Sequence, residues 1–190
     1  MKEPATPQEI IDRSQAVPMF ATKTIHDSYN LFLRFFEGDF DEDKLLQGAY
    51  MVYGWMPTML RIKGPVKNIV TLAEAGREGT ITEAILGDCA KTLNNSLVGT
   101  TKLLHFLCPG TYPIWDSRVY RGLFRQKPYR CRVEHVEAYT KYLAWMETLE
   151  KCDGFDEMKA RFEAEAGYEV SNKRAAEAVL YALGKPEKKK

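Results

Sequence analysis

Two side chains that could act together in covalent chemistry stand 14 residues apart in the segment 101–124, TKLLHFLCPGTYPIWDSRVYRGLF. Lys102 opens an apolar run of helical character, and Asp116 follows a turn that contains proline. An amine of lowered pKa can attack an electrophilic carbon and form a Schiff base, and a nearby carboxylate can hold or deprotonate that amine. One Lys and one Asp are therefore a sufficient set, and we expect no cofactor.

The chain can bring these two side chains together. A helix over residues 102–108 spans about 10 Å at a rise of about 1.5 Å per residue, and the connection 109–115 is long enough to return over that distance. The sequence permits this arrangement without requiring it. Asp116 before Ser-Arg-Val is also a good helix N-cap, and a lysine in a first helical turn is often only solvated. His105, three residues after Lys102, is interpreted as a core or rim histidine.

A cluster of cations follows the aspartate. Six Lys and Arg residues and no acid occur between residues 117 and 132. Arg118, Arg121 and Arg125 recur at helical spacing and can share one face. In a chain of net charge +1 such a local excess can neutralise nucleic-acid phosphates. Alternatively, the face is solvated and pairs with the acidic stretch 37–43.

Composition indicates an ordinary globular protein, with 45% hydrophobic and 28% charged residues among 190. No apolar run approaches the ~18 residues of a membrane span, and the N-terminal sequence lacks the apolar core of a signal peptide, so we expect a cytoplasmic protein without a membrane partner. The four cysteines show no CxxC or CxH spacing, which argues against a zinc or iron–sulfur site. We expect no bound metal.

The elements that must position the site are predicted to be helices. Thr6-Pro7-Gln8-Glu9 is a capping sequence, and helical stripes recur along the chain while strict alternation is rare. Pro57 is expected to break or kink a helix, and the polar run 94–101 is expected to be a turn. The sequence predicts an all-α, compact bundle of about eight to ten short helices. One helical domain, residues 1–186, would precede a basic tail, residues 187–190.

The segment around the two candidate residues resembles the helix-hairpin-helix DNA glycosylase superfamily. In that superfamily a hairpin of the VGxK type precedes a helix, and the bifunctional members carry a catalytic Lys at the end of the hairpin. A turn of the form P-V-D-x-H-V-x-R then supplies a catalytic Asp. Val98-Gly99 match the hairpin, and PIWDSRVYR, residues 113–121, matches the aspartate turn. One extra Thr follows the glycine, so either Lys102 or Thr101 occupies the lysine position. Arg118 stands at the position expected to hold His, and the resemblance covers about 30 residues.

The resemblance implies a two-lobed helical fold that acts on double-stranded DNA, with or without a modified base. A glycosylase of this kind attacks C1′ of a nucleotide extruded from the duplex, where a carboxylate stabilises the oxocarbenium-like state. Two alternatives stay open: a non-catalytic helical module on the same scaffold that binds nucleic acid or a protein, and an unrelated helical scaffold. The residues that the resemblance and the basic run assign are catalytic Lys102 and Asp116, and DNA-binding Gly99, Thr100, Thr101, Arg118, Arg121 and Arg125.

Overall fold

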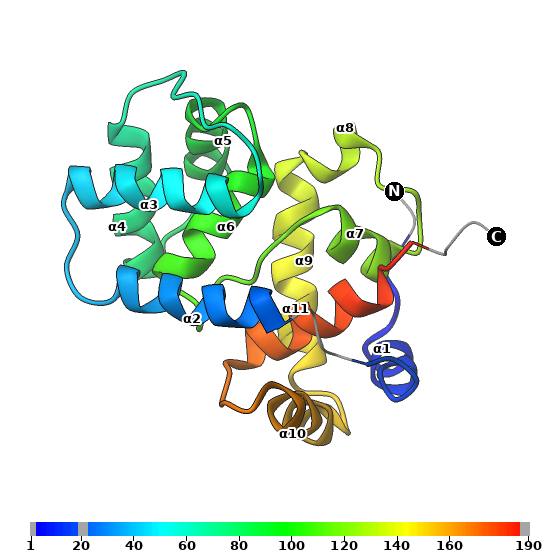
Figure 1. The fold of residues 1–190 in the computed structure, drawn as a ribbon. Helices are drawn as coiled ribbons and strands as arrows, with labels where there is room; N and C mark the ends of the chain where they lie inside the picture. Colours follow the sequence, from blue (N-terminus) through cyan, green and yellow to red (C-terminus); the bar gives the residue numbers. More distant parts are fainter. Residues whose placement is uncertain (1–2, 19–22, 187–190) are drawn as a thin grey trace.

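The fold is all-α in a computed structural model that describes residues 3–18 and 23–186 (Figure 1). Within these residues the β structure is one isolated antiparallel bridge, between Ile62 and Leu93. The all-α prediction is confirmed, with eleven helices in the described chain instead of eight to ten; the predicted tail, residues 187–190, lies outside it. The helices are α1 (Pro7–Ser14), α2 (Lys23–Phe36), α3 (Glu42–Trp55), α4 (Lys67–Glu78), α5 (Glu83–Thr92), α6 (Leu97–Leu107), α7 (Ser117–Phe124), α8 (Arg130–Val133), α9 (Val136–Leu149), α10 (Phe155–Ala166) and α11 (Asn172–Leu183).

Several helix ends lie where local sequence signals place them. Thr6 caps α1 and forms a capping box with Glu9, whose carboxylate accepts the Thr6 N–H at 2.9 Å. Helix α3 ends at Trp55, two residues before Pro57, because a proline ring cannot continue a helix. None of the helices in the described chain is long and apolar enough to cross a membrane.

The start of α6 differs from the prediction of a turn over residues 94–101. Asn94 and Asn95 make the turn alone, in the left-handed conformation with φ of 60° and 55°. Asn tolerates this conformation better than most residues. Ser96 then caps α6 by accepting a hydrogen bond from the Gly99 N–H at 3.1 Å. Val98 and Gly99 therefore lie inside the first turn of α6.

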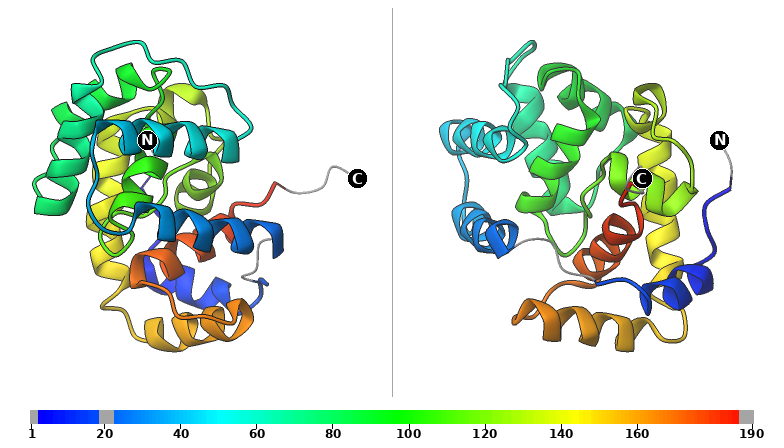
Figure 2. Two further views of the ribbon diagram at one scale, coloured as in Figure 1. Left: turned by 60° about the vertical axis from the view of Figure 1, so that its left-hand side comes forward. Right: turned by 45° about the vertical axis from the view of Figure 1, so that its right-hand side comes forward.

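The helices pack as two groups that meet where α6 leads into α7 (Figures 1 and 2). Helices α2 to α5 pack against one another and around α6. Helix α1 packs with α9, α10 and α11, and α7 lies along α11, so this second group combines segments from both halves of the sequence. The junction of the two groups is also where Lys102 and Asp116 lie.

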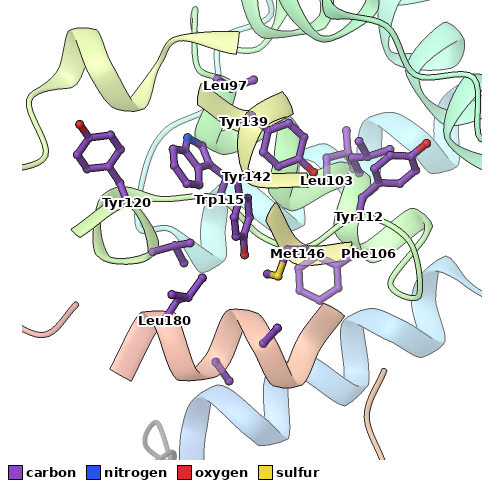
Figure 3. Close-up of a cluster of buried hydrophobic side chains, with 14 of the residues drawn as sticks. Leu97, Leu103, Phe106, Tyr112, Trp115, Tyr120, Tyr139, Tyr142, Met146 and Leu180 are labelled. Atoms are coloured by element: carbon purple, nitrogen blue, oxygen red, sulfur yellow. The ribbon is translucent and has the colours of Figure 1, made fainter. Parts of the chain in front are cut away.

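Trp115, in the connection from α6 to α7, lies in a cluster of buried aromatic side chains from α7 and α9 (Figure 3). Its side chain is fully buried, and its ring centroid lies 5.0 Å from that of Tyr142 and 5.8 Å from that of Tyr120. The indole N–H donates to the Val133 carbonyl at 2.8 Å. These contacts fix the backbone immediately before Asp116.

Helices α7 and α11 approach each other at glycine residues. A Cβ atom at Gly122 would collide with the backbone of Leu180, and one at Gly184 would collide with the carbonyl of Arg118. Close backbone approach holds α7 rigidly, and α7 begins at the candidate aspartate.

Candidate active site

Lys102 and Asp116 lie together in the structure. The Lys102 Nζ atom is 3.8 Å from Asp116 Oδ2, and the two side chains are 14% and 16% exposed. The other oxygen of Asp116, Oδ1, accepts hydrogen bonds from the N–H groups of Arg118 and Val119 at 2.8 and 3.0 Å. Asp116 is therefore both the N-cap of α7 and the neighbour of the lysine, so its role as a cap leaves one oxygen directed at Lys102.

Thr101 joins the two segments that carry the site, α6 and the connection that leads into α7. Its Oγ1 donates to the Trp115 carbonyl at 3.2 Å and accepts from the Trp115 N–H at 3.3 Å. Each of these residues directly precedes a candidate residue, so this pair of bonds aligns Lys102 with Asp116. Thr100 and Thr101 are fully buried. Of the two residues that could occupy the lysine position, Lys102 faces the cleft and Thr101 faces the core.

Lys102 and Asp116 line a cleft of about 830 Å³. The C-terminal end of α3 and the loop after it form one wall, and the segment around α8 forms another. The Trp55 ring belongs to the first wall, and its indole N–H donates to Ser28 Oγ at 3.0 Å, which fixes the ring plane. The Lys102 ammonium lies 5.5 Å from the centroid of that ring.

The environment of the lysine favours its neutral form. Burial lowers the pKa of Lys102 below its ordinary value of 10.5, and the charge of Asp116 opposes part of that shift. A lowered pKa raises the fraction of free amine at a given pH, and the free amine is the nucleophilic form. The structure thus places an amine of lowered pKa next to a carboxylate.

The three arginines of α7 make contacts within the protein. Arg125 pairs with Glu9 of α1, with Nη1 2.7 Å from Oε1, rather than with the acidic stretch 37–43. Arg121 donates to the Gly184 carbonyl at 2.9 Å. The Arg118 guanidinium lies 3.9 Å from the ring centroid of Tyr181. The predicted phosphate-binding face is therefore directed at α1 and α11, and its role in DNA binding stays a prediction.

The backbone N–H groups at the start of α6 already have acceptors. Gly99 donates to Ser96, as described above, and the Glu134 carboxylate accepts from the N–H groups of Leu97 and Val98 at 2.5 and 3.4 Å. A Cβ atom at Gly99 would collide with the Tyr53 hydroxyl. Packing against α3 therefore explains the glycine without a ligand.

Other cleft residues were not selected from the sequence. Arg61, Lys63 and Arg130 are exposed and line the cleft, and within the described chain none of the three forms an ion pair. Arg130 belongs to the basic run, but nothing in the local sequence connects Arg61 or Lys63 to the site. Trp55 and Glu134 also line the cleft, and only the tertiary packing, not a local sequence signal, places them there.

His105 is a buried core residue, as interpreted from the sequence. Its Nε2 lies 2.9 Å from the Tyr29 hydroxyl and its Nδ1 lies 2.7 Å from the Tyr112 carbonyl. Among the described residues, no group of three or more His, Cys, Asp or Glu side chains could hold a metal ion.

Comparison of the chain with protein-family models, with curated proteins and with solved structures finds no match. The resemblance to the glycosylase superfamily therefore stays a hypothesis.

Proposed function

We propose that the chain is a DNA glycosylase-like protein that removes or recognises a modified base in a nucleotide extruded from double-stranded DNA. The observation that supports this function is the Lys102–Asp116 pair, nearly buried at the edge of a cleft. A cleft of about 830 Å³ lies within the usual range for small-ligand sites, ~300–1,000 Å³. Trp55 offers an aromatic wall, on which a nucleobase can stack.

The chemistry follows from the two side chains. The neutral Lys102 amine donates its lone pair to C1′, and the bond between C1′ and the base breaks, with its electron pair leaving on the base. Asp116 accepts a proton from the new C1′–N group. The lone pair of the nitrogen then forms the C=N bond as the C1′–O4′ bond opens, O4′ takes the proton back from Asp116, and a protonated Schiff base remains between C1′ and Nζ. Before attack, the carboxylate also stabilises positive charge at C1′.

Phosphates of the strand would contact the rim of the cleft. Arg61, Lys63 and Arg130 lie there, exposed and without an ion-pair partner in the described chain. Their charges are free to neutralise phosphates, in contrast to the internally bonded arginines of α7.

The alternative function is a non-catalytic nucleic-acid or protein-binding module on the same scaffold. The occupied N–H groups at the start of α6 favour it, because Glu134 already fills the place where a backbone phosphate would bind. Under this alternative the Lys102–Asp116 pair serves only to hold α6 against α7.

Borohydride trapping separates the two functions. The protein is incubated with a panel of duplexes that carry modified bases, and borohydride is added to reduce any Schiff base to a stable adduct. We expect an adduct with at least one duplex, and we expect Lys102→Gln to abolish it. Lys91→Gln, which changes an exposed lysine paired with Asp88 on α5, is the matched control and should trap normally. Absence of any adduct and of any base release across the panel would favour the non-catalytic module.

A further inference from the structure

The cleft contains a second carboxylate that is anchored like Asp116. Glu134 uses Oε2 to accept the two N–H groups at the start of α6, as Asp116 uses Oδ1 at the start of α7. The remaining oxygen of Glu134, Oε1, has one long contact, 3.4 Å from Ser96 Oγ. Glu134 and Ser96 both line the cleft. One oxygen is thus structural, and the other has capacity to accept hydrogen bonds from a ligand.

Glu134 contacts the first turn of α6, and Lys102 lies about one turn further along the same face of that helix. Val98, whose N–H binds Glu134, precedes Lys102 by four residues and so lies on the same face of α6. Four residues correspond to a rise of about 6 Å along the axis. A nucleoside presents its sugar at one end and the far edge of its base at the other, which matches an amine and a carboxylate arranged along one wall.

We infer that Glu134 determines base specificity by accepting hydrogen bonds from the far edge of the base, and that it selects a guanine-type purine. Guanine presents two adjacent donors there, the ring N1–H and the 2-amino group, and both can reach one carboxylate oxygen. Adenine presents an acceptor at N1, which a carboxylate repels. The inference rests on the proposed function for one point, the placement of the sugar beside Lys102.

The variant Glu134→Gln replaces the hydrogen-bond acceptor that would face the base with a donor. The N–H groups of Leu97 and Val98 are donors, so the amide oxygen of the glutamine must stay on them. The amide NH2 group then takes the place of Oε1. A hydrogen-bond donor thus replaces an acceptor with almost no change in size. The Gln side chain can then donate to an acceptor on the base, such as N1 of adenine.

Binding of nucleoside monophosphates tests this directly and needs no catalysis. Trp115 and Trp145 are buried, while Trp55 lines the cleft, so quenching of tryptophan fluorescence reports on ligands there. We expect dGMP to bind about tenfold or more tightly than dIMP, which lacks only the 2-amino group, and than dAMP. Glu134→Gln should lose the preference for dGMP and gain affinity for dAMP. Thr58→Ala, at another cleft-lining position, should keep the wild-type order.

Two results would overturn the inference: equal affinity of the wild type for dGMP, dIMP and dAMP, or no saturable binding of any of them. If Glu134→Gln does not fold, as judged by circular dichroism, the wild-type comparison of dGMP with dIMP still decides. The outcome is distinct from that of the proposed function. A dGMP preference with neither an adduct nor base release from any duplex rejects the glycosylase and keeps the ligand assignment. An adduct or base release that does not depend on the N1–H and 2-amino donors of the base keeps the glycosylase and rejects the ligand assignment.

Discussion

At the scale of single residues, the site depends on carboxylates with two roles. Asp116 caps α7 with one oxygen and faces Lys102 with the other. The types of these residues and the length of the connection between them permitted the pair without requiring it, and the structure brings the two side chains together. Trp55 and Glu134 could not be predicted, because each lies far from the pair in sequence and reaches the cleft only through the packing of α3 and α8 around α6.

The two roles of Asp116 can be separated by substitution. Asp116→Asn keeps an oxygen to cap α7 but removes the charge, so base excision should fall about a thousandfold, corresponding to ~4 kcal/mol of transition-state stabilisation. The pKa of Lys102 should fall further, because the Asp116 charge raises it. Asp116→Ala should in addition lower the free energy of unfolding by about 1 kcal/mol through loss of the cap. Excision kinetics and urea denaturation measure the two effects; equal excision by Asp116→Asn and the wild type would exclude a catalytic carboxylate.

At the scale of elements, the positions of Lys and Arg in the sequence did not reveal whether their side chains face solvent or other helices. The helical spacing correctly places Arg118 and Arg121 on α7, whereas Arg125 is the C-cap that follows the helix, in the left-handed conformation. It could not show that α1 and α11 cover this helix, since Glu9 and Gly184 are remote in the sequence. Charges on an element become a binding surface only where the tertiary structure leaves them unpaired.

Two triple variants compare the candidate DNA faces. Arg61→Ser, Lys63→Ser and Arg130→Ser together should weaken duplex binding and lower the slope of log affinity against log salt by about three units, at roughly 0.9 per phosphate contact. The α7 set, Arg118→Ser, Arg121→Ser and Arg125→Ser, removes the same charge and should lower stability while changing the slope little. Fluorescence anisotropy over a salt series gives both slopes. If instead the slope falls for the Arg118, Arg121 and Arg125 variant and stays unchanged for the other, the DNA-binding face predicted from the sequence would be supported.

The contact between α7 and α11 predicts an unusual response to a small substitution. Gly122→Ala places a methyl group against the Leu180 backbone, which cannot move aside as a side chain could, so we expect a loss of ~2 kcal/mol or more in the free energy of unfolding. Gly87→Ala on α5 has no neighbour within 4 Å and should raise stability by about 0.5–1 kcal/mol through helix propensity. Thermal melts of the two proteins should therefore shift in opposite directions.

At the scale of the whole molecule, local signals predicted the helices and left their arrangement open. Caps, Pro57 and the helical stripes act over a few residues, so the sequence carries them directly. The placement of α1 against α9, α10 and α11 depends on contacts between distant segments, such as the Trp145 indole N–H donating to the Ala5 carbonyl at 2.8 Å. The early start of α6 was missed for a local reason, because a turn of two left-handed Asn residues is shorter than its polar composition suggests.

A buried polar network joins the two groups of helices around His105. Burial raises the pKa of Tyr29 to about 12, so its hydroxyl keeps the proton and donates to Nε2, and Nδ1–H donates to the Tyr112 carbonyl. Arg174, which forms a buried ion pair with Glu177, lies over the Tyr29 ring. Burial, with a further contribution from the Arg174 charge, lowers the pKa of His105 from 6.5 to about 3. The imidazole is therefore neutral in the folded protein at neutral and mildly acidic pH.

This network should make the fold sensitive to acid. Below pH 6.5 the unfolded chain protonates His105 while the folded chain does not until about pH 3, so the unfolded state binds more protons and is favoured as the pH falls. The stability due to neutral His105 is complete above pH 6.5 and is lost by up to ~1.4 kcal/mol per pH unit below it. His105→Gln cannot titrate and should show a shallower decline, although it is less stable at neutral pH. Urea denaturation at pH 7.5, 6, 5 and 4 (roughly one-unit steps) gives both curves. Carboxylates contribute equally to the two proteins, so parallel curves would show that His105 is protonated alike in the folded and unfolded states.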